Sequence, residues 1–349
     1  MVKKSSGKKA TTTTQKVAAT VTTPPVSPEV QGDPKHQQRL LDIFSEAFYS
    51  VLSADTFPTL IQEIKQALFN RDFSTAFGRE DYLEAYAARW SPTRALCYSH
   101  VLRGLESHLS PITTAAAGSD KGRSNLQVVS IGGCAAEHVA VASYVSQCSL
   151  EGGHITLVDS APWSQVASLM HARLTMPPEL SRYASASAKA SNCAFIEPER
   201  LSMSFVQKDV LSLDGRTVAD LLRLGPGEGR DPLLVTLFFT LNELYTDGGI
   251  GKTTSFLTSL GRSLPNGSLL LVLDSPGSYS ETALGKEKKR YPMHWLLDHT
   301  LLKADDASVK WEKLKSNDSK WFRLPDTLRY PMQLENMRYQ MHLYKLERC

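Results

Sequence analysis

Short apolar runs alternate with amphipathic stretches over the last two thirds of the chain. Five runs are rich in aliphatic and β-branched residues and are separated by segments with helical spacing, a pattern typical of a parallel, doubly wound sheet. Two later β-like segments are expected to form an antiparallel hairpin at the sheet edge. The predicted fold class is therefore α/β, with a Rossmann-like, mostly parallel sheet. The five runs are residues 126–131, 154–158, 203–206, 233–239 and 268–273, and the two late segments are residues 309–314 and 338–345.

The first third of the chain has a helical pattern instead. Apolar residues recur at spacings of three and four, which predicts an N-terminal helical region at 36–115, ahead of a larger α/β domain at 116–349. Ser91 followed by Pro92 is typical of a helix start, and we expect a helix to begin there and run through Leu105. The first apolar face is formed by Leu40, Phe44, Ala47, Phe48 and Val51.

Residues 1–35 are predicted to be a disordered basic tail. They are rich in Lys, Thr, Ser and Pro, and no acidic residue precedes Glu29, so the segment cannot bury enough apolar surface to offset the entropy cost of ordering. A solvated tail and a basic arm for nuclear targeting or RNA contact are both open interpretations. The net charge of the whole chain is only +3, so its distribution matters more than its sum.

The cysteine spacing and the hydropathy of the chain argue against several classes of protein: disulfide-rich, zinc-binding, membrane and secreted proteins. The five cysteines are widely spaced and include no C-x-x-C pair, which argues against a disulfide framework or a zinc site and fits a reducing compartment. No apolar run reaches the roughly 18 residues of a membrane span, and the N-terminus lacks the apolar stretch of a secretory signal. We therefore expect neither a bound metal nor a membrane.

The tips of the first two strands are the best candidates for a cofactor site. Gly132-Gly133-Cys134 follows the first strand, where a glycine turn and a helix N-terminus let an anionic group approach the backbone. Asp159 ends the second strand, where a carboxylate accepts hydrogen bonds from both ribose hydroxyls of an adenosine-containing cofactor. A tight structural turn and a solvated strand-end aspartate are the alternatives.

The tips of the later strands carry further polar and aromatic candidates. Asp209 follows the third strand, where methyltransferases commonly have an acidic residue beside the adenine, although a helix cap is an equal alternative. After the fourth strand, Phe239 can stack on a base and joins the cofactor-binding candidates. Asn242 and Glu243 can hydrogen-bond a substrate base, and Asp274 lies on the same rim after the fifth strand. We take the last three as catalytic candidates, with helix capping and turn formation as alternatives.

One motif and one cysteine suggest other chemistries. Gly248-Gly249-Ile250-Gly251-Lys252-Thr253 suggests a phosphate-binding loop, but the pattern needs glycine where Thr246 stands, so a helix start is predicted. Cys134 is badly placed to attack a pyrimidine ring and is expected to be a small buried residue. Methylation at a ring nitrogen needs no such nucleophile, only a positioned, deprotonated nitrogen. Glu243 or Asp274 can assist that deprotonation.

Three segments resemble those of a known family, the fungal 25S ribosomal RNA uridine-N3 methyltransferases. They are Phe69 to Gly78, Tyr86 to Leu96 with its Arg-Trp-Ser-Pro-Thr-Arg core, and Val129 to Glu137, and the resemblance covers roughly residues 37–349. It implies a class I methyltransferase sheet, S-adenosylmethionine as cofactor, and a nucleolar enzyme acting on large-subunit rRNA or a pre-ribosomal particle. It also implies cofactor contacts for Gly132, Gly133 and Asp159, and an adenine-side position for Asp209.

Features outside the cofactor tips keep other functions open. Arg89 and Arg94 are candidates for binding RNA phosphate or the cofactor carboxylate, with pairing inside the helical layer as the alternative. Ala135 stands where methyltransferases commonly have glycine; a methyl group there can narrow the pocket but need not abolish binding, because alanine tolerates most backbone geometries outside the left-handed region. An NAD-dependent oxidoreductase shares the glycine turn and acidic tip, but G-x-G-x-x-G is absent. A non-catalytic ribosome-assembly factor with a degenerate site is the third hypothesis.

Overall fold

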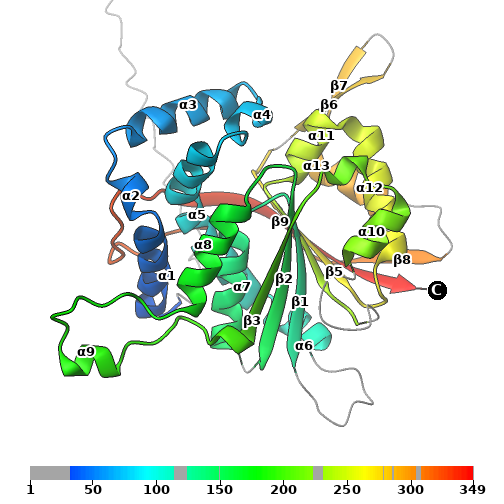
Figure 1. Cartoon of the computed structure of the whole chain (residues 1–349). Helices are drawn as coiled ribbons and strands as arrows, with labels where there is room; N and C mark the ends of the chain where they lie inside the picture. The colour runs from blue at the N-terminus through cyan, green and yellow to red at the C-terminus, as the bar shows by residue number, and fades with distance from the viewer. Residues whose placement is uncertain are drawn as a thin grey trace, which may run out of the picture. The chain divides into compact units, whose positions relative to one another are not determined.

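The computed structural model describes most of the chain after the predicted tail (Figure 1). Of the tail predicted at residues 1–35, residues 1–31 lie outside the described residues, and α1 begins at Pro34. No helix in the described part combines the length and hydrophobicity needed to cross a membrane. The structure describes residues 32–113, 124–148, 150–222, 231–277, 279–284, 287–303 and 308–348.

A seven-stranded sheet forms the centre of the fold, in the order β3-β2-β1-β4-β5-β9-β8. The first five strands are parallel, while β9 is antiparallel to both β5 and β8, so the predicted parallel sheet and late hairpin are confirmed. Parallel strands read as continuous apolar runs because helices cover both their faces. The strands are β1 (Asn125–Ile131), β2 (Gly152–Asp159), β3 (Leu201–Gln207), β4 (Leu234–Phe238), β5 (Leu269–Asp274), β8 (Val309–Phe322) and β9 (Met337–Arg348).

Two apolar clusters pack on opposite faces of this sheet. Alternate strand residues divide between them: Val128 joins the first cluster and Val129 the second, as expected for a period of two. The first cluster also contains the N-terminal helices, which thereby become part of the same core. Its main helices are α1 (Pro34–Ala47), α3 (Phe57–Phe69), α5 (Glu80–Arg103), α7 (Ala136–Gln147) and α8 (Ser164–Thr175), and the second cluster holds α10 (Gly215–Leu222), α11 (Leu241–Asp247), α12 (Gly249–Ser263) and α13 (Met293–Leu302).

Helix α5 is longer than the sequence suggests. The expectation that a helix begins at Ser91 is wrong, because α5 continues through Pro92. A proline inside a helix leaves the carbonyl four residues earlier without its usual donor. That carbonyl belongs to Ala88, and the Tyr330 hydroxyl donates to it at 2.8 Å. The proline is therefore tolerated because a distant segment satisfies the freed group.

A short hairpin of β6 (Tyr279–Leu284) and β7 (Glu287–Pro292) stands apart from the main sheet between β5 and α13. The sequence analysis did not predict it, since its strands lack the apolar runs that marked the others. The remaining short elements are α2 (Tyr49–Leu52), α4 (Phe73–Ala76), α6 (Glu106–Thr113), α9 (Ala186–Ala190) and the 3-10 turns Pro198–Arg200 and Val210–Ser212. The predicted helix start near Gly249 is confirmed by α12.

Candidate active site

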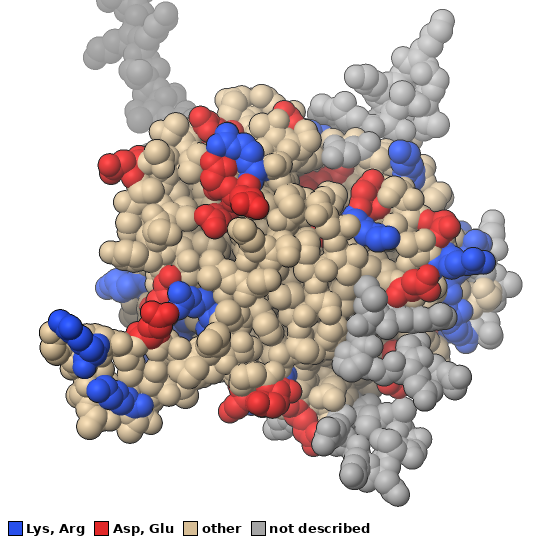
Figure 2. Space-filling view, viewed as in Figure 1, with Lys and Arg blue, Asp and Glu red and all other residues tan. Residues whose placement is uncertain are grey.

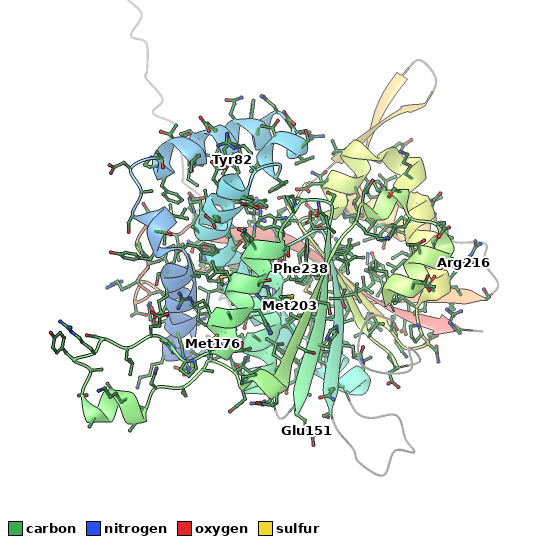
Figure 3. All side chains as sticks on the ribbon, viewed as in Figure 1. Tyr82, Glu151, Met176, Met203, Arg216 and Phe238 are labelled. Atoms are coloured by element: carbon green, nitrogen blue, oxygen red, sulfur yellow. The ribbon has the colours of Figure 1, made fainter. Side chains whose placement is uncertain are left out.

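A cavity of about 510 Å³ opens at the carboxyl ends of the parallel strands. This is where open α/β sheets bind ligands, and the volume lies in the usual range for small-molecule sites. Figure 3 labels Phe238, the last residue of β4, which lies on this rim and lines the cavity. The walls come from the segments after β1, β2, β3 and β4, from α11 and α12, and from α4 and α5 of the helical region.

The glycine turn after β1 is shaped by its neighbours in the fold. Gly132 has a left-handed backbone (φ 71°), and a Cβ there would collide with the side chain of Thr240, whose hydroxyl donates to the Gly132 carbonyl at 2.5 Å. A Cβ on Gly133 would lie 2.5 Å from Oε1 of Glu137. Gly132 therefore requires glycine, whereas a side chain at Gly133 would have to displace the flexible end of Glu137, and both residues line the cavity.

Ala135 differs from what the sequence analysis expected. Its φ of 100° places it in the left-handed region at the N-cap of α7, whereas we expected an ordinary backbone there. A methyl group in this region is strained by about 1–2 kcal/mol. The strained residue lies in the loop that faces the cavity, where such conformations tend to accompany ligand sites.

Asp159 lies beside the glycine turn, as predicted. Strands β1 and β2 are neighbours, with Ile131 paired to Val158 and the Gly132 amide donating to the Val158 carbonyl at 2.8 Å. One carboxylate oxygen of Asp159 accepts from the Ala161 amide at 2.8 Å, and the side chain lines the cavity. Burial raises its pKa to about 6. The two strand tips therefore meet across the cavity floor.

Asp209 caps a short turn and also lines the cavity, so it is compatible with both interpretations of the sequence, a cap and a residue beside the adenine. Its carboxylate accepts from the Leu211 amide at 2.9 Å, which caps the short turn after β3. The exposed side chain also lines the cavity, next to Lys208. The cap fixes the side chain at the mouth, where the second oxygen can face a ligand.

Arg94 and Glu137 bring a charged pair of groups to the cavity wall. Arg94 donates to the Tyr86 hydroxyl at 2.5 Å, and its guanidinium lies 5.1 Å from the ring centre of Phe239. Glu137 is buried in the first turn of α7, and burial raises the pKa of its carboxyl to about 7. The sequence analysis quoted Glu137 within a motif but gave it no role. An acidic residue in the first turn after the glycine turn was the available signal.

Two buried oxygens in the cavity wall are without hydrogen-bond partners among the described residues. They are Oε2 of Glu137 and the hydroxyl of Ser91. Buried polar atoms are nearly always satisfied in folded proteins, so such atoms in a cavity indicate a bound ligand or water. Their presence beside Arg94 fits a ligand with both an ammonium and a carboxylate.

The side of the cavity that follows β4 is formed by an aromatic and an acidic residue, Phe239 and Glu243. Phe239 has a left-handed backbone (φ 58°), an uncommon and strained state for an aromatic residue, and its ring centre lies 6.4 Å from that of Tyr98. Glu243, in the first turn of α11, is half-buried and lines the cavity. Phe239 and Glu243 are thus brought together with the cofactor-side residues, as the sequence predicted.

Two predicted catalytic residues do not line the cavity. Asp274 is buried, and its carboxylate accepts from the backbone amides of Asn242 at 3.1 Å and Ser275 at 2.7 Å. Asn242 is the second residue of α11, whose N-cap is Thr240, so it is not a cap either. The expectation that both side chains face the reacting centre is not met, since Asp274 supports the start of α11 and Asn242 lies outside the cavity lining.

Arg89 and Cys134 are also reassigned. Arg89 is buried and pairs with Glu335 at 2.5 Å, away from the cavity lining. Arg89 is thus paired within the protein, as the alternative had it, but its partner lies between β8 and β9 and not in the helical layer. Cys134 lines the cavity, but burial raises the pKa of its thiol well above the ordinary value. It is therefore a small wall residue and not a nucleophile.

An aromatic wall from the helical region was missed by the sequence analysis. The rings of Phe77, Tyr86 and Trp163 contact one another, with centres 5.1 to 6.0 Å apart, and all line the cavity. Edge-to-face and tilted ring contacts of this kind are stabilising and exclude water. Their residues come from α4, α5 and the loop before α8, so only the tertiary fold brings them together.

The residues around the cavity fit S-adenosylmethionine. A Cβ at either glycine would run into Thr240 or Glu137, so the turn stays tight and its backbone lines the cavity, and Asp159 offers a carboxylate on the neighbouring strand. Arg94 and the unpartnered oxygen of Glu137 match a carboxylate and an ammonium group. Within the described ranges, no group of three or more His, Cys, Asp or Glu side chains could hold a metal ion.

Two solved structures of methyltransferases resemble this fold in outline. The N-methyltransferase NodS from Bradyrhizobium japonicum WM9 in complex with S-adenosyl-L-homocysteine gives a TM-score of 0.36 at 10% identity, covering 84% of this chain and 98% of that chain. The plantazolicin methyltransferase BpumL in complex with the same ligand gives 0.37 at 12% identity, covering 82% and 99%.

Sequence comparisons give a closer relationship. The 25S rRNA (uridine(2843)-N(3))-methyltransferase of Saccharomyces cerevisiae is 29% identical over 336 residues, which is 88% of this chain and 85% of the yeast protein. A model of the family described as "Putative SAM-dependent methyltransferase" matches residues 44–345. Because that match spans most of the chain, including both strand tips and the helical wall of the cavity, the protein belongs to this family of S-adenosylmethionine-dependent methyltransferases.

Proposed function

We propose that the protein methylates N3 of a uridine in large-subunit (25S) rRNA. The observation that carries this proposal is the single cavity that joins Asp159, Glu137 and Arg94 on one side to Phe239 and Glu243 on the other. The choice of substrate is supported by the similarity to the yeast rRNA uridine-N3 methyltransferase. A pre-ribosomal particle as partner and the nucleolus as location follow from such a substrate.

The cofactor is held by residues of the strand tips and of α5. Asp159 accepts hydrogen bonds from the ribose hydroxyls, and Asp209 lies on the adenine side. Arg94 binds the carboxylate of the methionine moiety, and Glu137 binds its ammonium. Bound in this way, S-adenosylmethionine supplies a methyl group on a positively charged sulfur, which is open to in-line displacement.

Glu243 and Phe239 prepare the uridine for this displacement. The target base leaves its stack to enter the cavity, where the ring of Phe239 provides a stacking surface. The Glu243 carboxylate accepts the proton from N3, and the electron pair left on N3 forms the new bond to the methyl carbon as the bond to sulfur breaks. The aromatic wall of Phe77, Tyr86 and Trp163 keeps water from this step.

Nucleoside mass spectrometry tests the proposal. The full-length protein is incubated with S-adenosylmethionine and large-subunit rRNA that lacks the modification, and the digested RNA is analysed for 3-methyluridine. We expect 3-methyluridine with the wild-type protein and none without S-adenosylmethionine. A different methylated nucleoside would overturn the base assignment. Binding of NAD in place of S-adenosylmethionine would overturn the reaction class.

A further inference from the structure

An exposed tryptophan lies close to two arginines near the end of β8. Trp321 is 50% exposed, and the guanidinium carbons of Arg323 and Arg338 lie 5.6 and 5.8 Å from its ring centre. Single exposed hydrophobic residues are common on protein surfaces and need no explanation. This one differs because two positively charged groups lie close to its ring, the combination with which proteins bind unpaired nucleotides.

The strand register places this cluster at the same end of the sheet as the cavity. Trp321 is paired with Arg338, and opposed residues of an antiparallel pair share a face. Arg338 precedes Gln340 by two residues and therefore lies on its face. Gln340 is paired with Asp274 at the carboxyl end of β5, and its side chain donates to the Ser275 carbonyl at 2.8 Å.

The distance from the cavity to the Trp321 cluster is one that a few nucleotides can span. Strand β4, which carries the substrate side of the cavity, is separated from β8 by three interstrand spacings, or roughly 14 Å. A few nucleotides span that distance. An RNA whose target base enters the cavity can therefore reach the cluster without a large bend.

The charges around the cluster favour a polyanion. Strand β8 contains four lysines but only two acidic residues, Glu312 and Asp318, and one of the lysines, Lys313, pairs with Asp298 of α13 at 2.8 Å. Arg338 donates to the Ser319 hydroxyl at 2.8 Å, which fixes its guanidinium, and Arg323 makes no ion pair within the part of the chain that the structure describes. On the face shown in Figure 2, by contrast, the described basic and acidic side chains are interspersed.

We infer that Trp321, Arg323 and Arg338 form a stacking platform for an unpaired RNA base near the methylated uridine. The inference rests on the proposed function, because it assumes an RNA substrate in the cavity. When the target uridine leaves its stack, neighbouring bases lose a stacking partner. The Trp321 ring replaces that partner, and the two guanidinium groups bind the adjacent phosphates.

RNA-binding measurements with matched variants test the platform. The full-length protein is titrated into a fluorescein-labelled single-stranded oligouridylate, and the dissociation constant is read from fluorescence anisotropy. Loss of base stacking in Trp321→Ala is expected to weaken binding roughly fivefold or more. Trp321→Phe keeps a ring and is expected to restore most of the affinity. Arg338→Gln is expected to weaken binding less and to reduce its salt dependence.

Trp295→Ala is the control. Trp295 is also exposed, at 46%, but its ring packs against Tyr291 and His299 and not close to two arginines. Unchanged affinity for the oligouridylate in Trp321→Ala overturns the platform, and so does a loss of affinity that also occurs in Trp321→Phe. If Trp321→Ala keeps its RNA affinity but loses a contact with another protein, the surface around Trp321 binds a protein partner instead.

Methylation assays separate this inference from the proposed function. In Trp321→Ala, the KM for rRNA is expected to rise while kcat at saturating rRNA stays at the wild-type value. If the wild-type protein forms no 3-methyluridine but Trp321→Ala still weakens RNA binding, the proposed function fails and the platform stands. If the wild type forms 3-methyluridine and the KM of Trp321→Ala is unchanged, the platform fails and the function stands.

Discussion

The cofactor side and the substrate side of the cavity differ in how directly the sequence determines them. Gly132, Gly133 and Asp159 end neighbouring strands, and the register of β1 and β2 brings them together. On the substrate side, Glu243 lines the cavity, but Asn242 next to it does not. Successive side chains of a helix differ in direction by about 100°. Which side chain near the start of α11 faces the cavity therefore depends on the residue at which the helix begins, and the strand pattern alone does not give that residue.

The largest effect is expected from the substrate side. Glu243→Gln removes the proton acceptor for N3, and general-base catalysis typically contributes about 10²–10⁴-fold. We expect kcat for 3-methyluridine formation to fall in that range while affinity for S-adenosylmethionine is kept. Single-turnover methylation and isothermal titration calorimetry measure the two quantities.

Asn242→Ala is the matched control, since Asn242 lies on the same turn of α11 but outside the cavity lining. Its kcat should remain within a few-fold of the wild-type value. A large loss in Asn242→Ala with full activity in Glu243→Gln would reverse the assignment of the two side chains.

The next effect is expected on the cofactor side. Asp159→Ala removes the charge-assisted hydrogen bonds to the ribose and should weaken affinity for S-adenosylmethionine by about 1–3 kcal/mol. Calorimetric titration measures this change, and Asp209→Ala, at the exposed mouth, serves as a milder comparison. Equal affinities for wild type and Asp159→Ala would place the ribose elsewhere.

Glu137, on the cofactor side, links the stability of the protein to pH. Burial raises its pKa from 4.5 to about 7, so the folded protein without cofactor holds an extra proton between these values. Its stability therefore falls as pH rises from about 4.5 through 7. At pH 8, Glu137→Gln should stabilise the cofactor-free protein by about 1–3 kcal/mol while weakening cofactor binding. Urea unfolding at pH 5 and pH 8 measures the effect, and a variant less stable than wild type at pH 8 would contradict it.

The smallest effect on catalysis is expected at Asp274. Because its carboxylate bonds two backbone amides at the start of α11, Asp274→Asn should lower the free energy of unfolding by about 1–2 kcal/mol. Its kcat at a temperature where the variant is folded should stay close to the wild-type value. Loss of activity without loss of stability would restore Asp274 as a catalytic candidate.

The fold and the cofactor tips were predictable because their signals are local. Apolar runs of the right length mark the five parallel strands, and the glycine turn and Asp159 come directly after two of them. Residues that act at a strand tip therefore needed only the strand pattern to be found.

The rest depends on contacts between distant parts of the chain. Pro92 does not end α5 because Tyr330 satisfies the carbonyl of Ala88, and Arg89 is not free for a substrate because Glu335 pairs with it. No local pattern encodes either contact. The aromatic wall was missed for the same reason, since its rings come from three separate segments that only the tertiary fold brings together.

The most direct test of the central claim is an experimental structure with S-adenosylhomocysteine bound. The account predicts the ribose hydroxyls on the carboxylate of Asp159 and the amino-acid end over Gly132 and Gly133, between Arg94 and Glu137. A ligand bound outside this cavity, or one whose ribose faces away from β2, would contradict it.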